Sequence, residues 1–266
     1  MPDEPLDAFI ARHAPALARD EVRHNMLVGL LSVAAASRPT DLMTWSLGEP
    51  GACAIQRTGR MLLLGALDRA HCAALAEATA SRAYPGVVGP DETALRFTEA
   101  AAGHRFAEPM PQRIYALRAP PGYPGAPGAA RPVTPDDAAL LGDWLRAFIA
   151  EAVPHDPPPA DAEIAALAGS GRLFFWEADG QPVAMAGIVR ETARTTAISM
   201  VYTPPAERGR GYAGSATAAV AEHAFARGRD TACLTTDLRN PRSNRCYIKI
   251  GFEPVCDAAF YARVGR

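Results

Sequence analysis

The most informative stretch of the sequence is VYTPPAERGRGYAGSATAAVAEHAFARG, residues 201–228. Strand-forming residues lead through two prolines into Arg-Gly-Arg-Gly, and an alanine-rich run typical of a helix follows. Gly209 and Gly211 lack a Cβ atom, so the backbone N–H groups around them can approach a ligand closely. The free N–H groups and the dipole of a first helical turn favour an anion. The stretch predicts either an anion site, with added positive charge from Arg208 and Arg210, or a helix-capping turn with two solvated arginines.

Around this stretch, the second half of the chain predicts the order β-α-α-β-β-β-α-β-α-β. Thr134 can cap a helix that begins at Pro135, and the Asp-Gly pair at 179–180 favours a hairpin. The predicted helices span 135–153, 161–168, 211–228 and 242–250, and the predicted strands include 195–203, 231–238 and 252–256.

The first half predicts helical material to about residue 36, three short strands within 41–67, helices over 68–83 and 90–102, and a strand over 113–119. Proline and glycine are dense over 119–135, which marks a seam. We therefore expect two domains, 1–127 and 128–266. The order of elements partly repeats between them, which indicates either an internal duplication or an unrelated α/β cap on the second domain.

Composition excludes several classes of protein. The 266 residues carry a formal charge of −2, without the basic excess that favours nucleic acid, and no apolar run approaches the length of a membrane span. The five cysteines form no C-x-x-C pair, which suits reduced thiols in a cytoplasm, and no metal-ligand pattern is present. We expect a cytoplasmic protein that binds neither nucleic acid nor membrane nor metal.

Two motifs in order resemble the GNAT (Gcn5-related) N-acetyltransferase family. The family's pyrophosphate signature [RQ]-x-x-G-x-[GA] stands here as Arg208-Gly209-Arg210-Gly211-Tyr212-Ala213. The segment NPRSNRCYIKIGF, residues 240–252, is similar to the family's N-x7-Y-x-K-x-GF ending except for one residue of spacing, since Asn240 lies seven residues before Tyr247. The resemblance covers residues 128–262.

The resemblance implies an α/β (α+β) fold with a mixed, mostly antiparallel central sheet flanked by helices, whose fourth and fifth strands splay apart. It also implies acetyl-CoA as the acyl donor. The pantetheine arm would pair with backbone groups of Met200 and Val201, the pyrophosphate would lie on the amides from Gly209 to Ala213, and Asn240 would bond the pantetheine amide.

The resemblance places Tyr247 where the family's general acid usually stands, with a phenol that can donate to the leaving thiolate. The alternative is a core tyrosine. No carboxylate or histidine stands in the strand before the prolines, and no base is assigned. The candidates for the general base are Glu191, Asp237, His155 and a water chain. We interpret His223 as a surface residue and Leu173–Trp176 as core.

The first half lacks the anion-binding pattern, so we expect a degenerate GNAT-like unit there. The function predicted for the chain is N-acetyl transfer from acetyl-CoA to a primary amine of a small molecule or peptide. The alternative is a non-catalytic regulatory protein that binds acyl-CoA. The sequence specifies neither the acceptor nor the oligomeric state.

Overall fold

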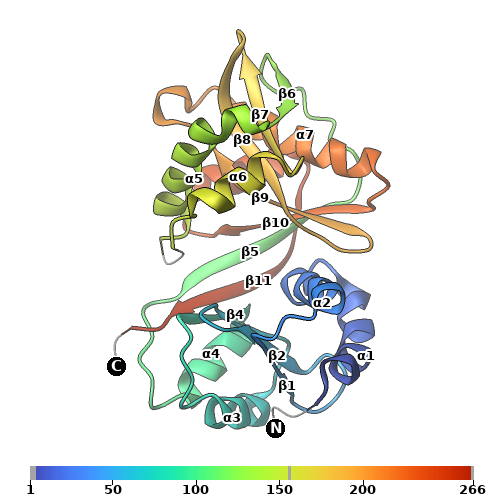
Figure 1. Ribbon diagram of the computed structural model, residues 1–266, viewed down its shortest axis with the longest axis vertical. Helices are drawn as coiled ribbons and strands as arrows, with labels where there is room; N and C mark the ends of the chain where they lie inside the picture. The colour runs from blue at the N-terminus through green and yellow to red at the C-terminus, as the bar shows by residue number, and fades with distance from the viewer. Residues whose placement is uncertain (1–3, 155–156, 265–266) are drawn as a thin grey trace. The chain divides into compact units, whose positions relative to one another are not determined.

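The computed structural model describes residues 4–154 and 157–264, which form two compact units (Figure 1). Unit 1 comprises Met1–Ile114, Thr235–Asn240 and Pro254–Arg266, and unit 2 comprises Tyr115–Leu234 and Pro241–Glu253. Both units are therefore assembled from separate segments of the chain. The 127/128 domain boundary stays a prediction.

Unit 1 begins with two helices and continues with short strands and two further helices. Its elements are α1 (Leu6–Leu17), η1 (Ala18–Asp20), α2 (Asn25–Ser37), β1 (Leu42–Ser46), β2 (Cys53–Arg57), β3 (Leu62–Leu64), α3 (Arg69–Ala78), β4 (Gly86–Pro90) and α4 (Asp91–Ala100). Strands β1, β2 and β3 pair antiparallel in turn, and β3 pairs parallel with β4 across helix α3. Trp45 and Phe97 are fully buried within a cluster of apolar side chains in this unit.

The last strand of the chain, β11 (Glu253–Ala262), pairs antiparallel with β4, from Ala258 opposite Pro90 to Ala262 opposite Gly86. The sequence placed this strand with the second half, whereas most of it belongs to unit 1. A Cβ atom at Gly86 would lie 2.4 Å from the carbonyl oxygen of Tyr261, so the glycine permits this close approach.

Unit 2 carries the longer strands. Its elements are β6 (Ala129–Pro132), η2 (Pro135–Asp137), α5 (Ala138–Ala152), α6 (Asp161–Ala168), β7 (Leu173–Ala178), β8 (Gln181–Glu191), β9 (Thr195–Tyr202), η3 (Pro205–Glu207), α7 (Tyr212–Ala226) and α8 (Pro241–Ile250). Strands β5 (Met110–Leu117), β10 (Thr231–Asp237) and β11 contain residues of both units. Within unit 2 the strands follow the order β10-β9-β8-β7-β6.

Alternation along β8 gives unit 2 a core on each face of its strands. Ala184 and Ala186 pack with α7, while Met185 packs with α5 and α6. Figure 1 accordingly shows α5 and α6 in front of these strands and α7 behind them. Leu173, Phe174 and Phe175 are buried, as predicted for this run, whereas Trp176 is half-buried.

The predicted hairpin and helix start in unit 2 are confirmed. Asp179 and Gly180 turn between β7 and β8 with φ of 51° and 73°, the positive values that a two-residue hairpin turn requires. Thr134 and Asp137 form a capping box at the start of η2, which leads into α5. The predicted order of elements from residue 128 is also observed, with β6 as its first strand.

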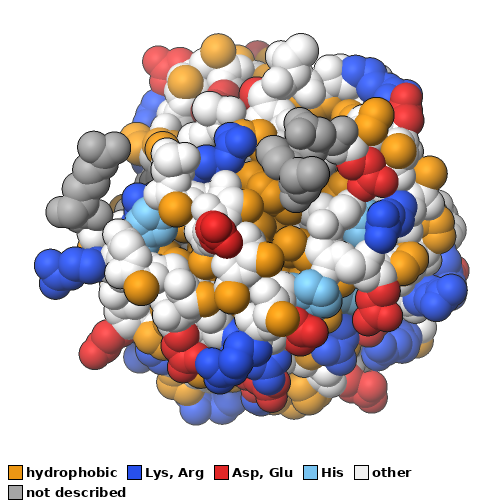
Figure 2. Space-filling view, turned by 90° about the horizontal axis from the view of Figure 1, so that it is seen from below, with side chains coloured by type: hydrophobic (Ala, Val, Ile, Leu, Met, Phe, Trp, Pro, Cys, Tyr) orange, Lys and Arg blue, Asp and Glu red, His pale blue; other side chains and the backbone are white. Residues whose placement is uncertain are grey.

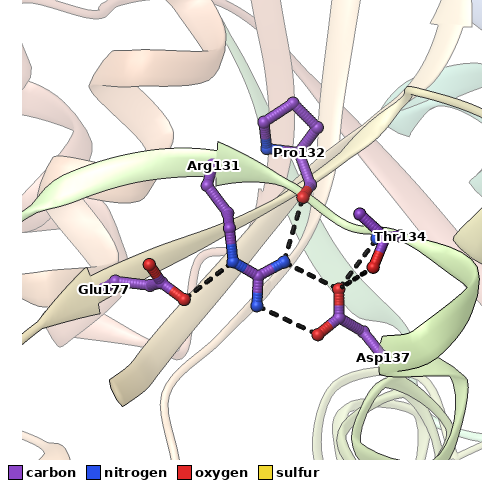
Figure 3. A network of polar contacts seen from close by, with 5 residues as sticks. All are labelled: Arg131, Pro132, Thr134, Asp137 and Glu177. Carbon is purple, nitrogen blue, oxygen red and sulfur yellow. Dashed lines mark hydrogen bonds and ion pairs between the residues drawn. The ribbon is translucent and has the colours of Figure 1, made fainter. Parts of the chain in front are cut away.

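The edge strand β6 is held by an ion-pair network (Figure 3). Arg131 donates to Glu177 at 2.7 Å and to both carboxylate oxygens of Asp137 at 2.7 and 2.9 Å. Asp137 also accepts from the backbone N–H of Thr134 at 2.8 Å. These bonds fasten β6 to β7 and to the start of α5, although proline and glycine flank the strand.

The two units share one order of elements, namely two helices, three antiparallel strands, a helix, a strand that pairs parallel with the third, and a further helix. In unit 1 these are α1 to α4 with β1 to β4, and in unit 2 they are α5 to α8 with β7 to β10. The partial repeat that the sequence suggested therefore extends to the sense of strand pairing.

Charged side chains of both signs are interspersed around hydrophobic ones on the face of the molecule in Figure 2. In the described part of the chain, no helix combines the length and apolar character needed to cross a bilayer. The same residues contain no group of three or more histidine, cysteine or acidic side chains arranged to hold a metal ion.

Candidate active site

Strands β9 and β10 begin as parallel neighbours and then part. Their pairing covers Thr195 to Ala197 of β9, opposite Thr231 to Cys233 of β10. The eight-residue β9 continues beyond this point to Tyr202 without a further pair on β10 among the described residues. Backbone groups on this side of β9 are therefore left for a ligand.

An irregularity in β9 follows the last of these pairs. Gly187 of β8 lies opposite Ser199, whereas Met185 lies opposite Tyr202, so β9 carries an extra residue in this interval. Met200 occupies the left-handed region with φ of 54°, which is uncommon for a residue other than glycine. Such bulges re-aim the backbone and are common beside active sites. The bulge falls at Met200 and Val201, the two residues predicted to pair with pantetheine.

The turn that opens α7 provides a row of free amides. Gly209 and Gly211 both have positive φ, 85° and 86°, and Gly211 is the residue before the first helical position. Within residues 4–154 and 157–264, the backbone N–H groups of residues 209–214 have no acceptor, and intrahelical bonding begins with Ser215 donating to Gly211. A Cβ atom at Gly209 would meet nothing within 4 Å, so its approach is open. The geometry is that of an anion site at a helix start.

The two arginines of the turn already have carboxylate partners. Arg208 donates to both oxygens of Glu151 on α5, at 2.9 and 2.8 Å, and to the carbonyl of Thr203 at 2.9 Å. Arg210 donates to Glu207 at 3.0 Å. Arg208 thus fastens the turn to α5, and the free amides rather than an unpaired guanidinium are the clearest anion donors here.

Sequence reasoning missed a tyrosine beside this turn. A Cβ atom at Gly214 would lie 2.7 Å from the hydroxyl oxygen of Tyr123, so any larger residue there would displace the tyrosine side chain. Ala126 of the same segment donates its backbone N–H to Ser215 at 2.7 Å. The proline- and glycine-rich seam therefore covers the start of α7. The sequence signal for this contact is Tyr123 itself, an aromatic residue within a segment that otherwise contains mainly proline, glycine and alanine.

Tyr247 lies on α8 and packs its ring against Phe252, with the ring centroids 6.2 Å apart. Burial raises the pKa of the Tyr247 phenol well above its ordinary value, Cys246 adds to this, and a side-chain hydrogen bond with Ser243 opposes it. The hydroxyl therefore stays protonated at neutral pH, as a proton donor must.

The candidate bases differ in position. Glu191 ends β8, opposite Thr196 near the first residues of β9, and pairs with Arg229 at 3.6 Å. Asp237 pairs with Arg239 at 2.9 Å and belongs to unit 1. His155 lies outside the described residues. His223 packs on Phe174 with ring centroids 4.9 Å apart. No base is assigned.

Asn240, predicted to bond pantetheine, belongs to the unit 1 segment 235–240, and its backbone N–H donates to Asp237 at 3.0 Å. Its role toward pantetheine stays a prediction. Tyr212 and Ala213 are the first two residues of α7, as the motif requires.

The equivalent helix start in unit 1 is capped by a carboxylate. Helix α3 follows β3 as α7 follows β9, but the residue before it is Asp68, whose carboxylate accepts from the backbone N–H of His71 at 2.8 Å. Asp68 thus occupies an amide that a phosphate would use and places negative charge there.

The comparisons with known proteins agree with this geometry. Residues 139–252 match the model of the Acetyltransferase (GNAT) family. Among solved structures, a Drosophila protein is 14% identical with a TM-score of 0.68, covering 97% of this chain and 95% of its own. GCN5-related N-acetyltransferases from Kribbella flavida and Sphaerobacter thermophilus are each 18% identical with TM-scores of 0.62, covering 92% and 95% of this chain and 96% and 94% of theirs. No curated protein matches the chain.

The structural likenesses establish the fold. The family match includes the region where β9 and β10 part, the glycine turn and Tyr247. Residues 139–252 therefore match an acetyltransferase domain of the GNAT family, and this match supports an acyltransferase that takes its acyl group from acyl-CoA.

Proposed function

We propose that the protein transfers an acetyl group from acetyl-CoA to a primary amine of a small molecule or peptide, and that unit 2 performs the reaction. The observation that carries this is the glycine turn, which presents six free amides at the start of α7 directly after a strand that has parted from its neighbour. A pyrophosphate on these amides would direct the pantetheine arm along the unpaired side of β9.

Residues 209–214 bind the pyrophosphate in this proposal, and backbone groups at Met200 and Val201 pair with pantetheine. The neutral amine attacks the thioester carbonyl carbon, a C–N bond forms, and the C–S bond breaks. The amine loses a proton to solvent, directly or through water. Tyr247 donates its phenolic proton to the departing sulfur and is reprotonated from solvent.

We further propose that unit 1 is a GNAT-like unit that has lost its own acetyl-CoA site. Its support is the shared order of elements and strand pairing, together with Asp68 at the helix start where unit 2 has Gly211. Unit 1 then completes the fold and does not carry a second acetyl-transfer centre.

Acetyl transfer across a panel of small primary amines and peptide amino groups tests the function, with free thiol release as the readout. We expect amine-dependent thiol release that is lost in Gly211→Glu. Acetyl-CoA binding without amine-dependent release by the wild type across the whole panel would contradict the proposal and favour a regulatory acyl-CoA-binding protein.

A further inference from the structure

Unit 1 contains a hollow of about 820 Å³ that the acetyl-transfer proposal does not use. Three segments far apart in the sequence and a turn glycine line it: Gly59, residues 80–85, residues 103–105 and Arg263. Its volume lies within the range of small-molecule sites.

Backbone hydrogen bonds fix the segments around this hollow to one another. Arg263 donates its N–H to the carbonyl of Pro85 at 2.8 Å, and Val264 donates to the carbonyl of Arg105 at 2.9 Å. The guanidinium of Arg263 also donates to the carbonyl of Arg82 at 2.8 Å. The lining is therefore set by main-chain contacts and does not depend on mobile side chains alone.

The lining carries positive charge without a counter-charge. Arg82, Arg105 and Arg263 form no ion pair within the described part of the chain, and the described lining residues include no carboxylate. Several arginines elsewhere in the chain have such partners. An anion in the hollow would meet three arginine residues and no carboxylate among the described lining residues.

Stacking positions two of these guanidiniums. Arg263 lies 4.9 Å from the ring centroid of Tyr84, and Arg82 lies 5.5 Å from that of Trp45. Arg105 is exposed, with no side-chain partner in the described residues. The imidazole Nε2 of His104, which also lines the hollow, is buried without a hydrogen-bond partner among the described residues.

We propose that this hollow is a second ligand site, which binds a small molecule through a phosphate group. Guanidinium forks match both carboxylate and phosphate, but a phosphate offers about two negative charges and three acceptor oxygens against one charge and two oxygens for a single carboxylate. Three arginines that have no carboxylate partner among the described residues fit the phosphate. The proposal rests on unit 1 alone and is independent of the acetyl-transfer reaction.

Titration calorimetry of the full chain with inorganic phosphate, in a low-chloride buffer, tests the site. We expect saturable binding below about 1 mM for the wild type and at least tenfold weaker binding for Arg105→Gln, because one charge-assisted hydrogen bond is removed. The matched control is Arg19→Gln, an exposed arginine of unit 1 outside the hollow, which should bind as the wild type does. Acetate, with one charge, should bind at least tenfold more weakly than phosphate.

Phosphate binding is also measured in Gly211→Glu, because the free amides of α7 could themselves hold the ion. Retained binding in that variant supports the site in unit 1, whereas loss there with full binding in Arg105→Gln would place the ion on α7 and overturn the proposal. Absence of saturable binding by the wild type, or equal binding by wild type and Arg105→Gln, would also overturn it. Arg105 contributes only its backbone carbonyl to the hydrogen bonds that fix the lining, so thermal melts should show that Arg105→Gln and Arg19→Gln are both folded.

Discussion

Replacement of Gly211 by glutamate is the sharpest test of how acetyl-CoA is held. Gly211 has φ of 86° and precedes the first residue of α7, and a Cβ atom there would lie 3.7 Å from that of Ala126, an ordinary contact. Neighbouring side chains therefore do not exclude the substitution. The new carboxylate would stand among the free amides and repel the pyrophosphate.

Two separate free energies follow from this geometry. A side chain in the left-handed region costs about 1–2 kcal/mol, which lowers stability without unfolding an ordinary domain. Charge-assisted hydrogen bonds contribute about 1.5–3 kcal/mol each, so loss of two amide–phosphate bonds costs about 3–6 kcal/mol. At about 1.4 kcal/mol per tenfold change in Kd, acetyl-CoA affinity should fall by roughly two to four orders of magnitude.

Gly228→Glu provides the matched control. Gly228 has φ of 80°, open space around its Cβ position, and lies just beyond the other end of the same 15-residue helix, about 22 Å along its axis. It introduces the same charge and similar backbone strain away from the amides. Calorimetry should show near wild-type acetyl-CoA affinity for Gly228→Glu and loss for Gly211→Glu. Equal affinities in the two variants would refute the proposed role of the turn.

Three further results are expected. Tyr247→Phe keeps the ring against Phe252 but removes the proton donor. We therefore expect kcat and kcat/KM to fall together by about 10²-fold, with acetyl-CoA affinity unchanged. Steady-state rates equal to those of the wild type would remove Tyr247 from the mechanism. Calorimetry should give one tight acetyl-CoA site per chain, because Asp68 closes the equivalent helix start in unit 1, and a stoichiometry near two would contradict this. The hydrogen bond from Arg131 holds the pKa of Asp137 well below its ordinary value, so this carboxylate stabilises the fold above pH about 4, and the stabilisation is lost as the pH falls further. Chemical denaturation at several pH values should show that Asp137→Asn lacks this pH-dependent part of the stability. Parallel pH profiles for the variant and the wild type would count against the prediction.

The resemblance to the family and the geometry of the glycine turn were readable from the sequence because their signals are local. Positive φ at Gly209 and Gly211 depends on residues that adjoin them, and the free amides follow from the start of a helix. The hairpin at Asp179-Gly180 and the capping box at Thr134 are likewise set within four residues. Local backbone geometry needs no knowledge of distant contacts.

Long-range packing decided the rest. Tyr123 reaches the start of α7 through a segment whose bond from Ala126 to Ser215 joins residues 89 apart, and no sequence period records that contact. The three arginines of the unit 1 hollow come from separate segments that backbone hydrogen bonds between Arg263, Val264 and their partners bring together. Strand β11 pairs with β4 because glycine at 86 admits its backbone, a choice between sheet edges that alternating hydrophobicity leaves open. The sequence thus determined which residues can form the glycine turn, while tertiary packing decided which segment covers it. The physical reason is that side-chain periodicity specifies which face of a helix or strand is buried and does not specify the segment that packs on that face.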